Sequence, residues 1–387
     1  MELTQPRYDA GGLAGVLPAV AASLGARLPG PAGAAGAGLE LPEARRAVVA
    51  LVDGLGFELL ARRGGHAPFL RSLLPDAYRL AAGFPSTTAT SMGTFGTGLP
   101  PGAHGLVGYE AFMPDEDRVF NELSWEDGPD PLEWQPHRTV FEELAAAGLD
   151  VTMVGPGYFD GSGLTRAALR GATGFAAANR PADRVPAALA ALSRIRRGLV
   201  YLYWGEVDRA GHEHGCASWQ WGQAVEEADA ALRSLARSLP KDTALYVTAD
   251  HGMVDVPFES RVDLAAEPEL AAGVRHLAGE ARAPQVHVEP GALKDVHGIW
   301  QARLGAAAVL RTREEVLDLG WFGPGAARDA VAGRIGDLVV ACQGEIAVVD
   351  SRTQPARILG LLGLHGSLTP DEVAIPLLRV APGGAHR

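Results

Sequence analysis

Uninterrupted apolar segments that run into a carboxylate constrain the fold of this chain more than any other feature. Three such segments cover residues 47–52, 198–204 and 244–249, and the carboxylates that follow them are Asp53, Asp208 and Asp250. Continuous apolar runs of this length, separated by helical stretches, are typical of buried parallel strands. In open α/β sheets the ligand binds beyond the carboxyl ends of the strands. Three acidic groups at that edge would repel one another unless a cation neutralised them, so the pattern predicts a metal site.

Strand and helix patterns alternate from residue 45 to about residue 255. Strands are expected at residues 47–52, 79–83, 150–154, 198–204 and 244–249. Helices are expected near residues 57–74, 88–97, 138–147, 182–194 and 218–238. This alternation predicts an α/β fold, a doubly wound and mostly parallel sheet with helices on both faces.

The pattern changes outside this region. Residues 1–40 are rich in Ala, Gly and Pro, and we expect an N-terminal helix and arm there. Residues 256–345 mix short strand candidates with helical stretches, and we interpret them as an inserted smaller α+β cap over the carboxyl edge of the sheet. The catalytic core would then comprise residues 41–255 and 346–387, resuming with a strand at residues 345–349.

Charge and cysteine content narrow the function classes. The formal net charge of −12 argues against a nucleic-acid backbone as the main partner, because phosphate binding needs clustered Lys and Arg. Cys216 and Cys342 cannot form a disulfide framework, and we expect two buried thiols. The first residues lack a basic segment followed by an apolar one, and no apolar run approaches the roughly 18 residues of a membrane span. We therefore expect a cytoplasmic protein without a membrane partner, and no pattern indicates an oligomeric state.

Two sets of side chains could each bind a metal ion. Asp208 and His212 are four residues apart, so one helical turn would orient them the same way, and His365 in a Gly-rich turn could fold back toward them. Asp and His suit Zn²⁺ and similar ions. The expected sets are Asp53, Asp250 and His251 for one ion, and Asp208, His212 and His365 for the other. Three protein ligands with an open position are typical of a catalytic metal site.

The segment Ser86-Thr87-Thr88 is the candidate source of a nucleophile. It precedes a helical stretch through Thr97, and a helix N-terminus favours an oxyanion or a phosphate. A metal bound to a hydroxyl lowers its pKa and activates it, and two metals clamping the attacking and leaving oxygens are a phosphoryl-transfer arrangement. Taken singly, Thr87 and Thr88 are more often helix caps. The hypothesis depends on the conjunction of all these residues at strand ends.

Five motifs, in order, resemble the alkaline phosphatase superfamily, and most closely its nucleotide pyrophosphatase/phosphodiesterase branch. They are Phe84-Pro-Ser-Thr-Thr88, Thr97-Gly-Leu-Pro-Pro-Gly-Ala-His-Gly-Leu106, Asp208-Arg-Ala-Gly-His-Glu-His-Gly215, Ala249-Asp-His-Gly-Met253 and Leu364-His-Gly366. The resemblance implies two divalent metal ions, Zn²⁺ first and Mn²⁺ as the alternative. It also implies a phosphorylated threonine intermediate, with Thr88 as both nucleophile and metal ligand.

The chain departs from the family pattern near the nucleophile. The family commonly has an Asn three residues after the nucleophile, which helps to hold a phosphate oxygen, and a Phe directly after it, which stacks on a nucleobase. Ser91 and Ala89 occupy these places here, and Tyr203 could keep the other half of the stacking slot. The resemblance therefore implies Ser91 and Tyr203 as substrate contacts, without a nucleotide-dedicated enzyme.

The sequence thus predicts a two-metal phosphoesterase that hydrolyses a phosphodiester or pyrophosphate bond in a small phosphorylated substrate. The alternatives are a phosphomonoesterase, a phosphonate hydrolase or a mutase on the same site, and a non-catalytic binding protein. Monoesterases need extra positive groups for the second charge, and Arg209, Arg261 and Arg275 are the candidates. No Lys or Arg lies beside Thr88 in sequence, the nearest being Arg79 and Arg118, which favours a diesterase.

Overall fold

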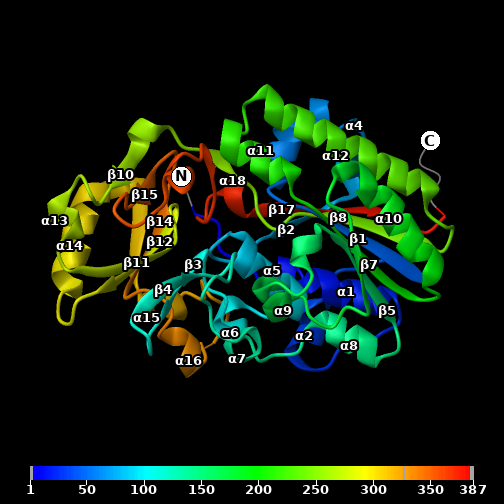
Figure 1. The fold of residues 1–387 in the computed structure, drawn as a ribbon, viewed down its shortest axis with the longest axis horizontal. Helices are drawn as coiled ribbons and strands as arrows, with labels where there is room; N and C mark the ends of the chain where they lie inside the picture. The colour runs from blue at the N-terminus through cyan, green and yellow to red at the C-terminus, as the bar shows by residue number, and fades with distance from the viewer. Residues whose placement is uncertain (1–2, 326, 384–387) are drawn as a thin grey trace.

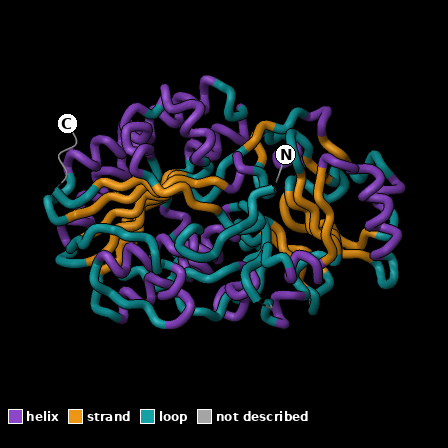
Figure 2. Tube along the Cα trace, turned by 180° about the vertical axis from the view of Figure 1, so that it is seen from behind, coloured by secondary structure: helices purple, strands orange, loops and turns teal. Residues whose placement is uncertain are grey.

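The computed structural model describes residues 3–325 and 327–383, which form an elongated molecule with two main β-sheets side by side (Figure 1). Seen from behind, the strands again fall into two separate groups (Figure 2). Within the described residues, the larger sheet has seven strands and the smaller sheet has six.

The larger sheet is mostly parallel. Its strand order is β2 (Tyr78–Ala81), β17 (Ala374–Val380), β8 (Thr243–Thr248), β1 (Arg46–Val52), β7 (Gly198–Trp204), β5 (Asp150–Gly155) and β6 (Gly174–Ala177). Neighbouring strands are parallel except around β17, which is antiparallel to both β8 and β2. The sequence did not predict β6, which is short and half-exposed, or β17, which contains Pro376. The predicted fold class is confirmed.

Helices cover both faces of the larger sheet (Figure 1). One face carries α4 (Pro68–Leu73), α10 (Pro181–Arg194), α11 (Glu206–His214) and α12 (Trp219–Ser238). The other carries α1 (Val16–Ser23), α2 (Gly30–Ala35), α5 (Thr88–Thr97), α8 (Val140–Ala146) and α9 (Gly163–Ala168). Because helices cover both faces, residues 47–52 of β1 are buried along their whole length. This burial is the physical reason for the continuous apolar pattern.

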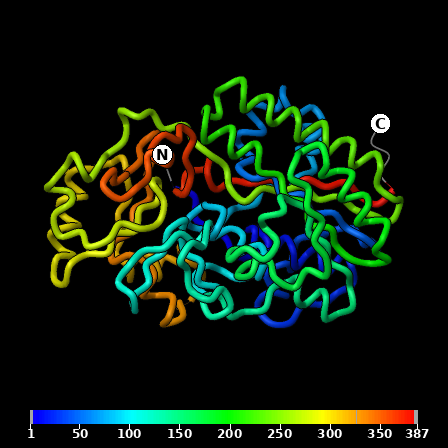
Figure 3. Tube along the Cα trace, viewed as in Figure 1, coloured from blue at the N-terminus to red at the C-terminus, as the bar shows by residue number. Residues whose placement is uncertain are grey.

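The second sheet is antiparallel throughout. Its order is β13 (Ala308–Thr312), β14 (Leu338–Cys342), β12 (Ala283–Val288), β11 (Val274–Glu280), β3 (Glu110–Met113) and β4 (Arg118–Asn121). Figure 3 shows the early segment with β3 and β4, in cyan, beside the late segments of this sheet. The structure corrects the expected place of residues 110–121, which pair with the second sheet although they lie within the predicted core range. Their partner β11 is distant in sequence, and strands this short carry no local signal for a distant partner.

A second correction concerns residues 345–349. The strand β15 (Ala347–Val349) pairs with β10 (Arg261–Asp263) instead of resuming the larger sheet, and β9 (Val254–Asp255) pairs with β16 (Gly363–Leu364). The N-terminal segment packs into the main core, because residues of α1 share the buried cluster that contains β1. The division into an arm, a core at residues 41–255 and 346–387, and a cap remains a prediction; residues 1–2, 326 and 384–387 of these ranges lie outside the described part.

The remaining helices are α3 (Phe57–Arg63), α6 (Pro101–His104), α7 (Pro131–Trp134), α13 (Pro268–Ala271), α14 (Leu293–Leu304), α15 (Arg313–Asp318), α16 (Asp329–Ala332), α17 (Ala356–Leu359) and α18 (Pro370–Val373). Among them, α3 packs against the larger sheet, and the others connect the two sheets or cover the second one. Cys216 and Cys342 are free and buried, as predicted. In the part of the chain that the structure describes, no helix has the length and apolar character needed to cross a bilayer.

Candidate active site and metal centre

The carboxyl ends of β1, β7 and β8 lie level with one another and position the predicted site. In the register of these strands, Leu51 lies opposite Tyr203 and Thr248. Asp53 and Asp250 therefore follow the ends of two adjacent strands. The helix α11 begins directly beyond β7 and carries Asp208 in its first turn. The three carboxylates that the sequence placed at one edge are brought together there.

These carboxylates have oxygen atoms without protein partners. Asp53 and Asp250 are almost fully buried, and Asp208 is partly buried. Among the described residues, Asp53 Oδ1, Asp208 Oδ1 and Asp250 Oδ2 are buried and make no hydrogen bond. Burial and the charges of Asp250 and Asp208 raise the pKa of Asp53 well above its usual value. Buried carboxylate oxygens that lie beside histidine Nε2 atoms and accept no hydrogen bond fit divalent cations, which would supply the missing positive charge.

The three predicted histidines share one hydrogen-bonding pattern. The Nδ1 atoms of His212, His251 and His365 lie 2.7, 2.9 and 2.9 Å from the carbonyl oxygens of Gly363, Gly252 and Ser86. Because a carbonyl oxygen only accepts, each Nδ1 carries the proton and each Nε2 keeps a free lone pair. This is the tautomer in which histidine binds a metal through Nε2. Burial and the neighbouring imidazoles hold the pKa of His365 well below its usual value, so its ring is neutral.

The ligand atoms converge into two overlapping groups. Asp208, His212 and His365 place ligand atoms within 4.8 Å of one another, and so do Asp53, Asp208 and His251. The first group is the predicted set. In the second, Asp208 stands where the prediction had Asp250, but Nε2 of His251 is 3.4 Å from Asp53 Oδ1 and 3.5 Å from Asp250 Oδ2. All six predicted side chains thus surround one centre, and Asp208 lies between the two groups.

Thr88 lies at the edge of this centre, on the first turn of α5. It is the first residue of the helix, it is half-buried, and its Oγ1 is 3.2 Å from Nε2 of His251. Thr87 occupies the N-cap position, yet its hydroxyl makes no capping hydrogen bond among the described residues. It donates instead to Oε1 of Glu280, in the second sheet. The two threonines therefore differ in environment: Thr88 faces the histidines and Thr87 faces the opposite wall.

The two predicted substrate contacts have other partners in the structure. Ser91 is fully buried and its hydroxyl donates to the main-chain carbonyl of Asp250 at 2.9 Å, so it supports the end of β8 and does not line the cavity. The Tyr203 side chain does line the cavity, and its hydroxyl donates to Oδ2 of Asp53. Its ring packs edge-on against Phe159 with 5.0 Å between the ring centres. Tyr203 thus touches a candidate metal ligand as well as the cavity.

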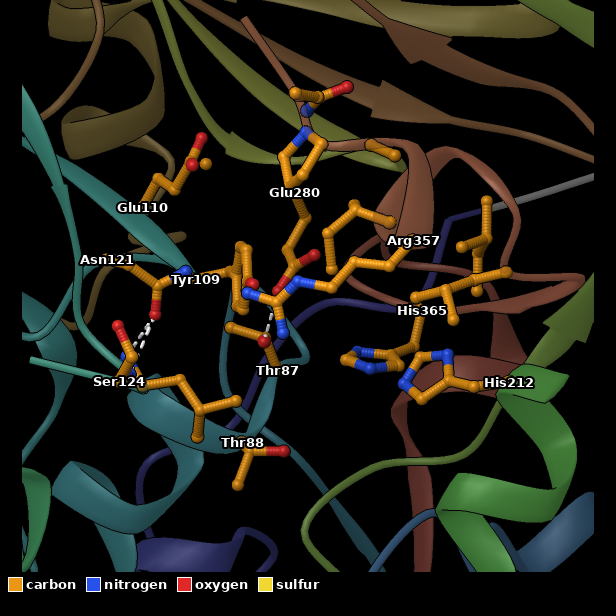
Figure 4. Close-up of a pocket in the computed structure, with 18 of the residues that line it drawn as sticks. Thr87, Thr88, Tyr109, Glu110, Asn121, Ser124, His212, Glu280, Arg357 and His365 are labelled. Atoms are coloured by element: carbon orange, nitrogen blue, oxygen red, sulfur yellow. Dashed lines mark hydrogen bonds between the residues drawn. The ribbon is translucent and has the colours of Figure 1, made fainter. Parts of the chain in front are cut away.

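A cavity of about 610 Å³ lies over the centre, between the two sheets. Figure 4 shows Glu280 reaching from the second sheet toward Thr87, with His212 and His365 beside the threonines. Sequence reasoning missed the wall that the second sheet, the residue before β3 and α17 contribute, which includes Tyr109, Glu110, Asn121, Glu280 and Arg357. No local pattern marks these residues, because long-range strand pairing brings them to the site.

The arginines proposed as extra positive groups are engaged elsewhere. The Arg261 guanidinium lines the cavity but donates to the carbonyl oxygens of Val256, Leu359 and Leu361. Arg275 pairs with Asp117, and the exposed Arg209 lies 3.9 Å from Glu206. Neither Arg209 nor Arg275 lines the cavity.

The chain is similar to known proteins in sequence and in fold. Residues 47–368 match the model of the type I phosphodiesterase / nucleotide pyrophosphatase family. Among solved structures, human ectonucleotide pyrophosphatase / phosphodiesterase 5 has a TM-score of 0.69 and 18% identity, over 87% of this chain and 88% of that chain. The murine protein, in an inactive form in complex with AMP, gives the same TM-score, identity and coverage.

A phosphonoacetate hydrolase from Sinorhizobium meliloti, in complex with phosphonoformate, is also similar in fold. Its TM-score is 0.64 with 18% identity, over 89% of this chain and 92% of that chain.

Proposed function

Because this chain belongs to the type I phosphodiesterase / nucleotide pyrophosphatase family, we propose that it hydrolyses a phosphodiester or pyrophosphate bond through a phospho-threonine intermediate on Thr88. The family consists of hydrolases that act on phosphoester bonds, so the class of reaction follows from membership. The nucleophile, the metals and the substrate class are the parts that the chain's own residues must support.

The position of Thr88 carries the proposal. Its hydroxyl lies on the first turn of α5, 3.2 Å from Nε2 of His251 and at the edge of the carboxylates with unpaired oxygens. The first N–H groups of a helix have no partner within the helix, and they attract phosphoryl oxygens. A substrate phosphoryl group seated on the start of α5 would thus lie against the Thr88 hydroxyl.

The donor set supports two divalent ions, Zn²⁺ first and Mn²⁺ as the alternative. Asp208, His212 and His365 would hold one ion, and Asp53, Thr88, Asp250 and His251 would hold the other. When bound, such ions lower the pKa of a coordinated hydroxyl and stabilise the charge on the attacking and leaving oxygens. The neutral Nδ1–H tautomers of the histidines hold their Nε2 atoms ready for this role.

The residues of the chain have separate roles in the reaction. Thr88 Oγ1, once deprotonated, attacks phosphorus in line, and the bond from phosphorus to the leaving oxygen breaks. Water hydrolyses the phospho-threonine in a second displacement, which regenerates Thr88 with overall retention at phosphorus. Meanwhile Tyr203 holds Asp53 in place through its hydroxyl, and Ser91 holds the main chain of Asp250.

Few cations of the cavity are free to hold the second negative charge of a monoester, which favours a diester. A monoester carries a second negative charge, which needs additional positive groups near phosphorus. Arg118 is tied to Glu116 and to the carbonyl of Asp127, and Arg261 to main-chain carbonyls. This leaves Arg357, whose guanidinium makes no ion pair or hydrogen bond within the described ranges. Phosphonate hydrolysis is the second candidate, because a phosphonoacetate hydrolase shares the fold and Arg357 could pair with a substrate carboxylate.

A substrate panel tests the proposal. The purified protein is stripped of metal, reloaded with Zn²⁺ or Mn²⁺, and assayed on aryl diesters, matching aryl monoesters, nucleotide sugars, dinucleotides and phosphonoacetate. We expect metal-dependent turnover with a higher kcat/KM for the aryl diester than for the monoester. A monoester preference of about tenfold, or about 1.4 kcal/mol, would overturn the diester assignment. Full activity in metal-free protein would overturn the two-metal site.

A further inference from the structure

The carboxylate of Glu280 is the group that the second sheet brings nearest to the nucleophile segment. Glu280 ends β11, and the preceding residue Gly279 pairs with Glu110 on β3. Its Oε1 accepts the hydroxyl hydrogen of Thr87, the residue directly before Thr88. The hydroxyl of an N-cap threonine would ordinarily cap its own helix. Here it fixes a carboxylate beside the start of α5 and leaves the first N–H groups of that helix uncapped.

The electrostatic surroundings of Glu280 are acidic. Glu110, Asp208 and Glu372 each raise the pKa of Glu280. Arg282, two residues further on, directs its guanidinium to Glu372 instead. No Lys or Arg forms an ion pair with Glu280 within residues 3–325 and 327–383. Burial and these carboxylates raise the pKa of Glu280 to about 8, so it is mostly ionised at pH 9.

We propose that Glu280 is a specificity determinant of this site. Its carboxylate, held in place by Thr87, disfavours substrates whose reacting phosphoryl group carries two negative charges. It thereby selects phosphodiesters over phosphomonoesters. This inference rests on the proposed phosphoesterase function and adds the residue that sets its substrate class.

The physical reason is an asymmetry between the two sides of the cavity. On the metal side, the candidate cations attract both classes of substrate. On the opposite wall the charged groups are Glu280, Glu110 and Arg357. The two carboxylates outnumber the one cation and repel any additional anionic oxygen, and a diester has one fewer such oxygen than a monoester. A like charge fixed near a reacting group acts on the transition state as well as on binding. The carboxylates can also accept hydrogen bonds from hydroxyl or amino groups on the substrate. Polar leaving groups without negative charge therefore fit this wall.

The variant Glu280→Gln tests the proposal without changing the shape of the wall. The amide oxygen still accepts the Thr87 hydroxyl, while the negative charge is lost. The matched control is Glu269→Gln, an exposed carboxylate in α13 that does not line the cavity. All proteins are loaded with Zn²⁺, checked for metal content and circular dichroism, and assayed at pH 9 with an aryl monoester and its matching diester.

We expect the ratio of monoester to diester kcat/KM to rise about tenfold or more in Glu280→Gln, and to stay at the wild-type value in Glu269→Gln. The inhibition constant of inorganic phosphate should fall by a similar factor in Glu280→Gln. In Glu280→Ala the ratio of monoester to diester kcat/KM should also rise. This variant replaces Glu280→Gln in the test if the Gln variant fails to fold.

Two outcomes distinguish a failure of the specificity role from a failure of the proposed function. If the folded, metal-loaded Glu280 variant keeps the wild-type ratio and the wild-type inhibition by phosphate, the specificity role is wrong while the phosphoesterase stands. If the metal-loaded wild type turns over no diester, pyrophosphate or monoester, the proposed function itself is wrong.

Discussion

Arg282 and Glu372 form a two-point ion pair in which both side chains are fully buried. Nε and Nη2 of Arg282 donate to the two carboxylate oxygens of Glu372 at 2.8 and 2.7 Å. Arg282 lies between β11 and β12, two residues after Glu280, and it also donates to the carbonyls of Gly344 and Ile346. The pair therefore anchors the hairpin of the second sheet to α18, near the end of the larger sheet.

The same pair supports two of the candidate ligand histidines. The carboxylate of Glu372 accepts the main-chain N–H of Ser367, two residues after His365. The main-chain carbonyl of Glu372 accepts the N–H of Gly252 at 2.7 Å, next to His251. Glu372 thus connects the β11–β12 hairpin to the main chain beside both histidines.

Removing one member of this pair should be costly. Glu372→Ala leaves the Arg282 charge buried without a partner, and we expect the free energy of unfolding to fall by about 3–5 kcal/mol. Denaturant unfolding of the Zn²⁺-loaded protein measures the change. Arg282→Met combined with Glu372→Leu should recover part of that loss, because the double variant buries no unpaired charge. A loss below about 1 kcal/mol for Glu372→Ala would show that the pair contributes little.

The two adjacent threonines should respond differently to substitution. Thr88→Ala should reduce kcat by at least about a thousandfold, because it removes the nucleophile, while most of the bound metal remains. Thr87→Ala removes a hydrogen bond to Glu280 and should change kcat/KM by only about tenfold. Kinetics and metal analysis on both variants measure this. If Thr87→Ala abolishes activity and Thr88→Ala retains it, the nucleophile lies one residue earlier, at Thr87.

Tyr203 offers a test of positioning against stacking. Tyr203→Phe keeps the ring and removes the hydroxyl that donates to Asp53, leaving a buried carboxylate oxygen without its donor. We expect weaker metal binding and a loss of about 1–3 kcal/mol in transition-state stabilisation. Metal titration and kcat/KM on an aryl diester report the two effects. If Tyr203 acts only through its ring face, the Phe variant will match the wild type and a Leu variant will not.

His287 should make the protein less stable in mild acid. The side chain is buried in the second sheet with its ring centre 4.3 Å from that of Phe112, and burial lowers its pKa to about 3 from 6.5. Because the folded-state pKa is depressed, the contribution of neutral His287 is fully present above pH 6.5 and is lost as the pH falls toward 3. Between pH 7 and pH 5 the loss amounts to about 2 kcal/mol.

Comparison with His287→Phe isolates this contribution. The variant has no group to titrate there, so its free energy of unfolding should fall less than that of the wild type over the same pH range. The metal-ligand histidines are common to both proteins and cancel in the difference. Parallel pH dependences for the two proteins would show that His287 titrates normally in the fold.

The sequence by itself determined the central parallel strands of the larger sheet and the positions of the strand-end side chains. Buried parallel strands require continuous apolar residues, so β1, β7 and β8 were visible locally, and the residues after them had to meet at one edge. The order of the motifs then indicated the family, and residues 47–368 match the family model. The positions of Asp53, Asp208 and Asp250 could be predicted because the local sequence marks where each strand ends.

Only the tertiary structure decided what faces those residues. The strands β3 and β4 join a sheet whose other strands lie far away in sequence, and this pairing brings Glu110 and Glu280 to the cavity wall. The direction of a side chain could not be predicted from the sequence either. Ser91 donates to the Asp250 carbonyl, and the Thr87 hydroxyl donates to Glu280 instead of capping its own helix. Pairing register and side-chain direction depend on contacts between distant segments, and local apolar periodicity carries no information about those contacts.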